Sequence, residues 1–369
     1  MILGLDCSSL LDVRAANGKF TVGGKPVEPL TYFHDEAGLD LLRLRLWVDP
    51  YDEQGHPYGG GTNDFERFLI LAKEGLSKGY RILLDFHYSD FWCDPSKQIL
   101  PKAWKDLNFE QLCVAFDEYT RKTLTDLKKE GIPLYAVQVG NEITNGMLWP
   151  HAHLDDVGPG KPRANYDKLS RLLTLGANAV REIYPEAKVL LHLEKSGDAA
   201  TYREFFDQMV AYKVPFDVIG VSYYPYWHGK FETLFANIDS LKERYGKPIW
   251  IVETAYAFTT EMPYEDDRSQ ETLDAGMAFP FPRTKEGQKE FLVGLMEESN
   301  RHGVEAILYW EPLWLPLPGL NWATYEGEVY TGETHKPLHN ESACYCLFDY
   351  EGEATPACLA FKTNREERE

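Results

Sequence analysis

The sequence predicts an α/β fold, namely a (β/α)8 barrel that fills residues 1–369 as a single domain. Eight short apolar runs alternate with longer segments whose apolar residues recur at helical spacing. The chain shows no internal repeat, low-complexity stretch or Ser/Gly-rich linker that would divide it. No apolar run is followed by a glycine-rich dinucleotide turn, which disfavours the main alternative, a doubly wound sheet.

The eight apolar runs have the length and composition of strands that are buried on both faces. Each is separated from the next by enough residues for a helix, as parallel neighbours require. The expected strands are Ile2–Leu5, Leu41–Leu46, Ile82–Phe86, Leu134–Val139, Val189–Leu193, Val218–Val221, Ile249–Val252 and Ala306–Tyr309.

Two of the intervening helices are the most clearly marked. One-sided apolar stripes run along both of them, at Phe65, Phe68, Leu69, Ala72 and Leu76, and at Phe109, Leu112, Phe116, Tyr119 and Leu127. Residues 63–66, Asn-Asp-Phe-Glu, resemble a capped helix start. Gly23 and Gly24 indicate a tight hairpin turn inside the first connection.

The composition limits the partners of the protein. Apolar residues make up 44% of the chain, and 38 basic against 58 acidic residues give a net charge of -20. An acidic surface argues against nucleic acid and against an anionic membrane as partners, and favours a neutral substrate. No run of about 18 apolar residues that could form a membrane-spanning helix occurs.

The cysteines and the start of the sequence bear on the compartment. Cysteines stand at positions 7, 93, 113, 344, 346 and 358, with irregular spacing and no CxxC pair, so we expect reduced thiols. The stretch "MILGLDCSSL" has none of the features of a signal peptide. These observations predict a cytoplasmic protein, or an exported one if a signal peptide precedes this sequence in the natural protein. The sequence carries no clear oligomer signal, and we expect a monomer.

Polar and aromatic side chains close almost every predicted strand. In a barrel these strand ends meet at one face, where the active site is built. The residues are Asp6; Arg43, Arg45 and Trp47; Asp85, His87, Tyr88 and Asp90; Asn141 and Glu142; His192 and Glu194; Ser222, Tyr223, Tyr224, Tyr226, Trp227 and His228; Glu253; and Tyr309, Trp310 and Glu311.

Glu142 and Glu253 are the two carboxylates of greatest interest, because the ends of strands four and seven face each other across the mouth. Such a pair suits glycoside hydrolysis, in which one carboxyl group protonates the leaving oxygen and the other attacks or activates water. Arg45, His87 and Asn141 are placed to hold the two groups in different protonation states and to bind sugar hydroxyls. The abundant Trp and Tyr residues offer flat faces on which sugar rings stack.

Other readings apply to individual residues. Asp6, Asp85 and Glu311 are expected to be structural carboxylates paired with Arg43 or Arg45, whereas Glu194 is left open. The stretches "HAH" (151–153) and "DFH" (85–87) have metal-ligand spacing but lack a convincing third ligand. The stretch "GGGT" (59–62) does not follow a strand and is a poor candidate for phosphate binding.

These residues together resemble glycoside hydrolase family 53, the arabinogalactan endo-β-1,4-galactanases. The resemblance is carried by "GLDCSSL" (4–10), "LRLRLWVDP" (42–50), "LLDFHYSDFWCDPSKQILPKAW" (83–104), "VQVGNEITNGMLWP" (137–150), "VIGVSYYPYWHG" (218–229), "IVETAYAFT" (251–259) and "YWEPLW" (309–314). It implies a (β/α)8 catalytic domain and a retaining mechanism, with Glu142 as acid/base and Glu253 as nucleophile. The implied substrate is β-1,4-galactan, the neutral side chain of pectin, which is cut internally.

The same reading predicts the substrate contacts and the cofactor requirement. Sugar-binding residues are expected at Arg45, Trp47, His87, Tyr88, Asp90, Trp92, Asn141, Tyr223, Tyr224, Trp227, Trp310 and Trp314, with Trp92 and Trp314 on the rim. The expected partners are galactan polysaccharide and oligosaccharides, and catalysis is expected to need no cofactor. Several bacterial members of that family hold a structural calcium with the loops after strands seven and eight, so the resemblance leaves a structural calcium open for this chain. Here the seventh loop, "TTEMPYEDDRSQETLDAG" (259–276), is acidic but lacks the expected Asp-Gly-rich run.

Three alternative functions stay open at this point. The chain could be another retaining barrel glycosidase that acts on mannan or cellulose, since these enzymes share the Asn-Glu pair. It could be a non-catalytic glycan-binding protein, although both carboxylates are present. A metal-dependent amidohydrolase would need a His/Asp ligand set that the sequence does not provide.

Overall fold

A closed barrel of eight parallel strands forms the centre of the molecule. The structure is a computed structural model that describes residues 1–158, 160–264, 281–332 and 339–362. The strands are β1 (Ile2–Asp6), β4 (Leu41–Leu46), β5 (Arg81–Phe86), β6 (Leu134–Val139), β9 (Lys188–Leu193), β10 (Val218–Tyr223), β11 (Ile249–Thr254) and β12 (Ala306–Trp310). They pair in this order, and β1 closes the barrel by pairing with β12. The predicted (β/α)8 barrel and all eight predicted strands are confirmed.

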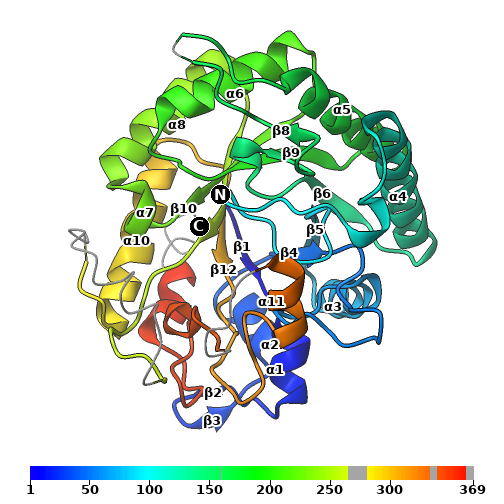
Figure 1. The fold of residues 1–369 in the computed structure, drawn as a ribbon. Helices are drawn as coiled ribbons and strands as arrows, with labels where there is room; N and C mark the ends of the chain where they lie inside the picture. The colour runs from blue at the N-terminus through cyan, green and yellow to red at the C-terminus, as the bar shows by residue number, and fades with distance from the viewer. Residues whose placement is uncertain (159, 265–280, 333–338, 363–369) are drawn as a thin grey trace.

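Helices surround the strands on the outside (Figure 1). The longer ones are α3 (Phe65–Ser77), α4 (Phe109–Lys129), α5 (Tyr166–Ile183), α6 (Ala199–Ala211), α8 (Phe231–Tyr245) and α10 (Lys285–Arg301). The shorter ones are α1 (Leu10–Ala15), α2 (Pro29–Asp35), α7 (Pro225–His228) and α11 (Tyr325–Thr331). None of the helices in the described part of the chain is both long and apolar enough to cross a membrane.

Local sequence signals explain where the two marked helices begin. Asp64 caps α3 by accepting a hydrogen bond from the Arg67 backbone N–H, as the start at residues 63–66 predicts. Asn108 and Gln111 form a reciprocal capping box at the start of α4. Each cap satisfies backbone donors that the first helical turn leaves without intrahelical partners, and so fixes the first residue of the helix.

The barrel interior changes character along its axis. In the part nearer the start of the strands, the interior is filled by small and large apolar side chains, namely Leu41, Leu83, Ala136, Leu190, Val218, Trp250, Val252, Ala306 and Leu308. Two residues further along several strands, the inward positions become polar, because alternate residues point to the same side. Arg43, Asp85, Gln138 and His192 are in this second layer, and all of them are buried. The upper half of the barrel is therefore a hydrogen-bonded polar core.

A strand irregularity brings Glu253 into this mouth. Trp250 and Val252 point into the barrel, so simple alternation would direct Glu253 towards the helices. The register of β11 shifts at this place against both neighbours, between Val221 and Ser222 on β10 and between Ile251 and Thr254 towards β12. Such a bulge re-aims a side chain, and here it turns the carboxylate inward.

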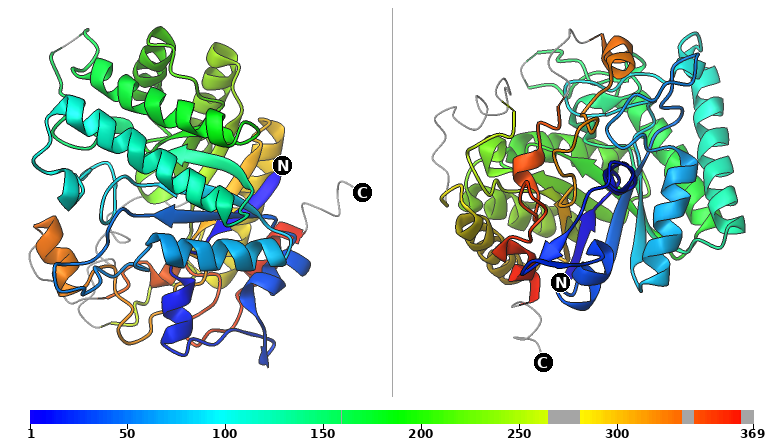
Figure 2. Two further views of the ribbon diagram at one scale, coloured as in Figure 1. Left: turned by 90° about the vertical axis from the view of Figure 1, so that its right-hand side faces the viewer. Right: turned by 90° about the horizontal axis from the view of Figure 1, so that it is seen from below.

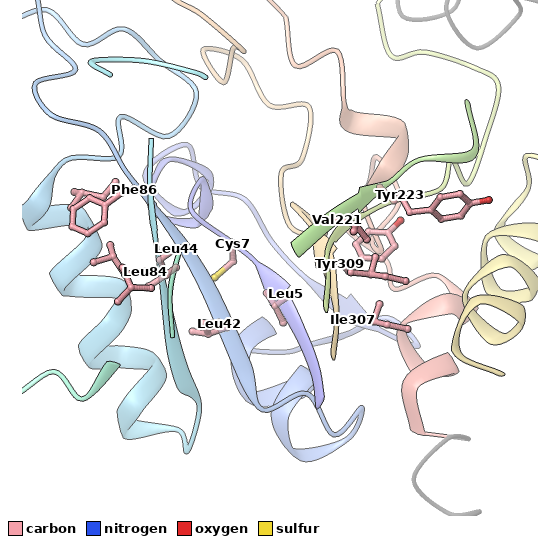
Figure 3. Close-up of a cluster of buried hydrophobic side chains, with 14 of the residues drawn as sticks. Leu5, Cys7, Leu42, Leu44, Leu84, Phe86, Val221, Tyr223, Ile307 and Tyr309 are labelled. Carbon is pink, nitrogen blue, oxygen red and sulfur yellow. The ribbon is translucent and has the colours of Figure 1, made fainter. Parts of the chain in front are cut away.

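The outer face of the barrel packs against the helices through a second apolar layer (Figure 3). This layer includes Leu42, Leu44, Leu84 and Ile307. The six cysteines are buried as thiols, and no disulfide joins them. Cys7 lies in this outer layer, as Figure 3 shows.

The connection between β1 and β4 contacts the C-terminal segment of the chain. The predicted hairpin forms from β2 (Thr21–Val22) and β3 (Lys25–Pro26), with Gly23 and Gly24 at φ 58° and 72°. The Glu353 carboxylate accepts hydrogen bonds from the N–H groups of both glycines, and residue 353 bridges to Thr21. Helix α11 lies at the end of the molecule opposite the chain start (Figure 2). The first connection and the C-terminal segment therefore hold each other in place.

Candidate active site

Glu142 leaves strand β6 in a strained backbone conformation. Its φ is 48° and its ψ is 51°, a left-handed geometry that residues with a Cβ atom rarely adopt. Gly140, with φ 90°, precedes it, so the chain turns sharply directly after the strand. This turn holds the Glu142 side chain at the barrel mouth, where it lines a cavity.

One carboxyl oxygen of Glu142 is held from the barrel interior. The Ser222 hydroxyl donates to Glu142 Oε1 at 2.6 Å, and His192 Nε2 lies 2.8 Å from the same hydroxyl. Oε2 is thus the oxygen that is left for substrate. Burial, followed by the nearby Glu253 and Glu194 carboxylates, raises the pKa of Glu142 well above its ordinary value.

Glu253 has partners that favour the charged form. Arg43 lies 2.9 Å from Glu253 Oε1, and the Tyr224 hydroxyl donates to Oε2 at 3.0 Å. Burial raises the pKa of Glu253, and the Arg43 guanidinium opposes that effect. Glu142 has no cationic partner of this kind among its hydrogen bonds in the described residues. A proton shared by the two carboxylates therefore resides on Glu142.

The two carboxylates are close together. One oxygen of Glu142 lies within 4.8 Å of one oxygen of Glu253. Retaining glycosidases hold their carboxyl groups about 5–5.5 Å apart, whereas inverting ones need about 6.5–9.5 Å to admit a water molecule. A nearest approach of two carboxylate oxygens below 4.8 Å favours the shorter spacing, which direct attack by one carboxylate on the sugar requires.

A buried ion network fixes Arg43 beneath the pair. Arg43 contacts Asp6 at 2.9 Å and Asp85 at 2.8 Å, besides Glu253. Arg45 joins Asp6 at 2.9 Å to Glu311 at 2.6 Å. The predicted pairing of Asp6, Asp85 and Glu311 with Arg43 or Arg45 is confirmed. Burial, opposed by Arg45, raises the pKa of Glu311 to about 7.

His87 is neutral in this network. Burial lowers the pKa of the imidazole, although Asp85 opposes the shift. Its Nδ1 accepts a hydrogen bond from the Cys93 backbone N–H at 3.0 Å, so the proton is on Nε2, which lies 3.1 Å from Asp85. His87 thus lines the mouth as an uncharged group with a fixed ring orientation.

Two cavities meet at the carboxylate pair. The larger one has a volume of about 650 Å³ and the smaller one about 140 Å³. Their walls share Asp94, Glu142, Glu253 and Trp310. The two cavities are therefore arms of one cleft, with the carboxylates at the junction, as cleavage within a chain requires.

Seven of the predicted substrate-binding residues line this cleft. Arg45, His87, Trp92 and Asn141 line the smaller arm, Tyr224 and Trp227 line the larger arm, and Trp310 lines both. Trp227 is 51% exposed, so its indole offers an open face at the rim. Trp92 stacks on Trp322 at a ring distance of 5.9 Å.

The other five predicted residues are not among the described residues that line these two cavities. Tyr223 points outward, where its hydroxyl donates to the Gly229 carbonyl, and Tyr88 lies against α4 with its hydroxyl 3.1 Å from Thr120 (Figure 3 shows Tyr223). Asp90 accepts from the backbone N–H groups of Asp49 and Lys102. Trp47 and Trp314 are each 1% exposed and pack against Trp92, which is itself only 6% exposed, so the prediction of Trp92 and Trp314 on the rim is wrong.

The glycine run at 59–61 packs against Trp92. Gly60 has φ 59°, and a Cβ atom there would lie 2.6 Å from Trp92 Nε1. The run therefore lets the loop pass close to the Trp92 indole. A packing role accounts for these glycines without phosphate.

Sequence reasoning missed several wall residues, because they come from long loops without a periodic pattern. Asp94, Pro95 and Ser96 follow β5, Lys195 follows β9, and Trp322, Ser342 and Tyr345 follow β12. Only their position after a strand end could have indicated them.

Neither stretch with metal-ligand spacing contributes to a cluster of three possible ligands among the residues that the structure describes. His153 pairs with Asp155 at 2.7 Å, and His87 pairs with Asp85, so both stretches are engaged in local contacts. Residues 265–276 of the seventh loop, on which the calcium prediction depends, lie outside the described residues.

Comparison with known proteins agrees with this geometry. The sequence profile described as Glycosyl hydrolase family 53 matches residues 2–361. The chain belongs to this family. Among the similar proteins, "Endo-beta-1,4-galactanase" of Bacillus subtilis (strain 168) is 32% identical over 98% of this chain and 85% of the relative. "Arabinogalactan endo-beta-1,4-galactanase" of Cellvibrio japonicus (strain Ueda107) is 31% identical over 98% of this chain and 90% of the relative.

Solved family 53 structures share the fold. The "Ignisphaera aggregans GH53 catalytic domain" superposes with a TM-score of 0.85 at 35% identity, and the match covers 98% of this chain and 95% of that one. A structure titled as one of "two fungal beta-1,4-galactanases" matches with a TM-score of 0.76 at 24% identity, over 98% and 99% of the two chains. The predicted family resemblance is confirmed.

Proposed function

We propose that this chain is an endo-β-1,4-galactanase, a retaining glycoside hydrolase that cleaves bonds within galactan or arabinogalactan, with residues 1–369 acting as one catalytic domain. The observation that carries the proposal is the close pair Glu142 and Glu253 at the junction of a two-armed cleft in a family 53 barrel. The galactanase names of the relatives support the choice of substrate over mannan or cellulose. The acidic net charge of -20 suits a neutral polymer.

In the first step, the Glu253 carboxylate attacks the anomeric carbon and Glu142 gives its proton to the leaving oxygen. Arg43 and Tyr224 hold the attacking carboxylate, and Ser222 holds Glu142 so that Oε2 faces the substrate. The bond from the anomeric carbon to the leaving oxygen breaks as the glycosyl–Glu253 ester forms. The leaving sugar departs with the proton.

In the second step, Glu142 is ionised and acts as the base. It removes a proton from a water molecule that attacks the anomeric carbon, and the bond to Glu253 breaks. Loss of the negative charge on esterified Glu253 removes one of the groups that raise the pKa of Glu142, so Glu142 ionises more easily at this stage. Each carboxylate therefore ends the cycle in the state in which it started.

We expect galactan to yield a ladder of oligosaccharides. A cleft that extends on both sides of the carboxylates accepts internal bonds, so early products should span several lengths. Chromatography of the first products from potato or lupin galactan, beside mannan and carboxymethylcellulose, tests this. Galactose as the sole early product would contradict endo action, and no release from galactan would contradict the proposed function.

The first-formed product should keep the β configuration. Two inversions at the anomeric carbon, one by Glu253 and one by water, give net retention. Proton NMR recorded during the first minutes of hydrolysis distinguishes the anomers before they equilibrate. An initial α-anomer would show that water attacks directly, whatever the substrate.

Chelation should leave turnover at 25 °C unchanged, because two carboxylates supply the acid, the base and the nucleophile. Initial rates on galactan before and after dialysis against EDTA measure this, and melting temperatures recorded on the same samples report any structural calcium. A rate that is lost on chelation and restored by zinc would refute the metal-independent mechanism.

A further inference from the structure

Glu194 is a buried carboxylate to which the described part of the chain donates no hydrogen bond. It follows β9, is 4% exposed, and shares the wall of the larger cavity with Glu142. Neither its Oε1 nor its Oε2 has a partner within the described residues. The Thr144 hydroxyl lies near enough to favour ionisation of Glu194, yet the two do not reach hydrogen-bonding geometry. The two steps described above give Glu194 no role.

Burial of an ionised carboxylate costs free energy unless other groups donate hydrogen bonds to its oxygens. Burial raises the pKa of Glu194, which shows that desolvation outweighs the support from its neighbours. A group that donates hydrogen bonds to both oxygens would remove this penalty. A sugar is such a group, because it carries hydroxyls on adjacent carbon atoms.

The position of Glu194 indicates which part of the substrate it meets. Arg45, His87 and Asn141 surround the smaller arm, and such fixed polar groups suit the sugar whose anomeric carbon must meet Glu253 in one orientation. The larger arm, lined by Glu142, Glu194 and Trp227, then receives the leaving sugar. Glu142 must contact the oxygen that this sugar carries, so the leaving sugar lies beside Glu194.

We propose that Glu194 is a specificity-determining residue that accepts hydrogen bonds from hydroxyls of the leaving galactosyl residue. In a β-1,4-linked galactosyl unit the departing oxygen is on C4, so the adjacent pair of free hydroxyls nearest to it is the pair on C3 and C2. Trp227 supplies an exposed aromatic face in the same arm. The inference rests on the proposed galactanase function and adds to it a preference for a sugar as leaving group.

The test compares two substrates that share the reacting part and differ in the leaving group. The leaving group of galactotetraose is a sugar that carries free hydroxyls. The leaving group of 2,4-dinitrophenyl β-galactobioside is 2,4-dinitrophenolate, which carries none. We expect Glu194→Ala to lower kcat/KM for galactotetraose by about 10- to 100-fold, the loss that follows from removing hydrogen bonds to a charged group. The aryl substrate should react within about twofold of wild type. Glu194→Gln keeps the size of the side chain and should show a smaller loss on galactotetraose alone.

Glu186→Ala is the matched control, because Glu186 is an exposed glutamate just before the opposite end of the same strand. Melting temperatures of all three variants exclude unfolding as the cause. The dependence of kcat/KM on pH is measured as well. If Glu194 acted only by changing the pKa of Glu142, its replacement would shift the basic limb of this profile and leave the maximal kcat/KM unchanged. That result would overturn the inference.

The other outcomes are equally decisive. Equal losses on both substrates would place Glu194 on the reacting side or in a structural role, and no loss on either would remove it from the site. Both results refute the inference while wild-type cleavage of galactan still supports the proposed function. A wild-type protein that leaves galactan intact would refute the proposed function itself.

Discussion

Replacement of Glu253 by Ala is expected to lower kcat on galactan by on the order of 10⁴-fold or more, because the variant has no group that can form the glycosyl intermediate. Arg43 keeps its contacts to Asp6 and Asp85, so the network beneath the site stays paired. The fold should therefore survive, and far-UV circular dichroism and the melting temperature check this. Glu186→Ala, far from the mouth, is the matched glutamate control.

A trapping experiment identifies the same residue directly. A 2-deoxy-2-fluoro galactobioside with a good leaving group should inactivate the wild type by forming a glycosyl ester that hydrolyses slowly. Mass spectrometry of the proteolysed protein should find the added mass on the peptide that carries Glu253. An adduct on another carboxylate, or a loss below tenfold in Glu253→Ala, would reject the assignment of the nucleophile.

Replacement of Glu142 by Ala should slow the cleavage of substrates with a poor leaving group and spare those with a good one. Cleavage of galactan needs a proton on the departing oxygen, so we expect a loss of about 10²–10⁴-fold. A 2,4-dinitrophenyl galactobioside needs no such proton and should still form the intermediate at nearly the wild-type rate. Added azide should then attack the intermediate in place of water, and the product should be a β-galactosyl azide.

The pH profile provides a second measurement on the same variant. Because the pKa of Glu142 is raised, the wild type should lose kcat/KM on galactan as the pH rises through that pKa and the acid loses its proton. The variant lacks this group, so its reaction with the aryl substrate should lose the basic limb. An α-azide product, or an unchanged basic limb, would reject Glu142 as the acid/base.

Much of the fold could be predicted because its signals are local. Buried parallel strands give apolar runs, and caps such as Asp64 mark helix starts. The predicted strands stop short at Leu5, Val221, Val252 and Tyr309 because the residues that follow are polar or aromatic. In the structure these strands continue into the ion network and the cleft wall. The sequence thus located the barrel mouth correctly, but the predicted strands ended before the residues that form the mouth.

The cleft wall was harder to predict, for two physical reasons. The rule that side chains alternate along a strand separates Tyr223 from Ser222 and Tyr224, and applying it would have placed Tyr223 outside. The same rule fails for Glu253, because the bulge in β11 depends on tertiary pairing that no local pattern encodes. Wall residues from long loops, such as Tyr345, have no periodic signal at all.

The closure of the barrel has a consequence for how the chain reaches this structure. Ile2 pairs with Ala306, so the contact that closes the ring joins residues near opposite ends of the chain. The bridge between Thr21 and Glu353, outside the barrel, spans a similar length of chain. Contacts of such long sequence separation form late and slowly, since most of the loop-closure entropy must be lost before they stabilise anything. During synthesis β1 must wait, with its apolar residues unpaired on one side, until β12 has left the ribosome. We expect the chain to be most prone to aggregation during this interval, because an apolar strand edge is then unpaired.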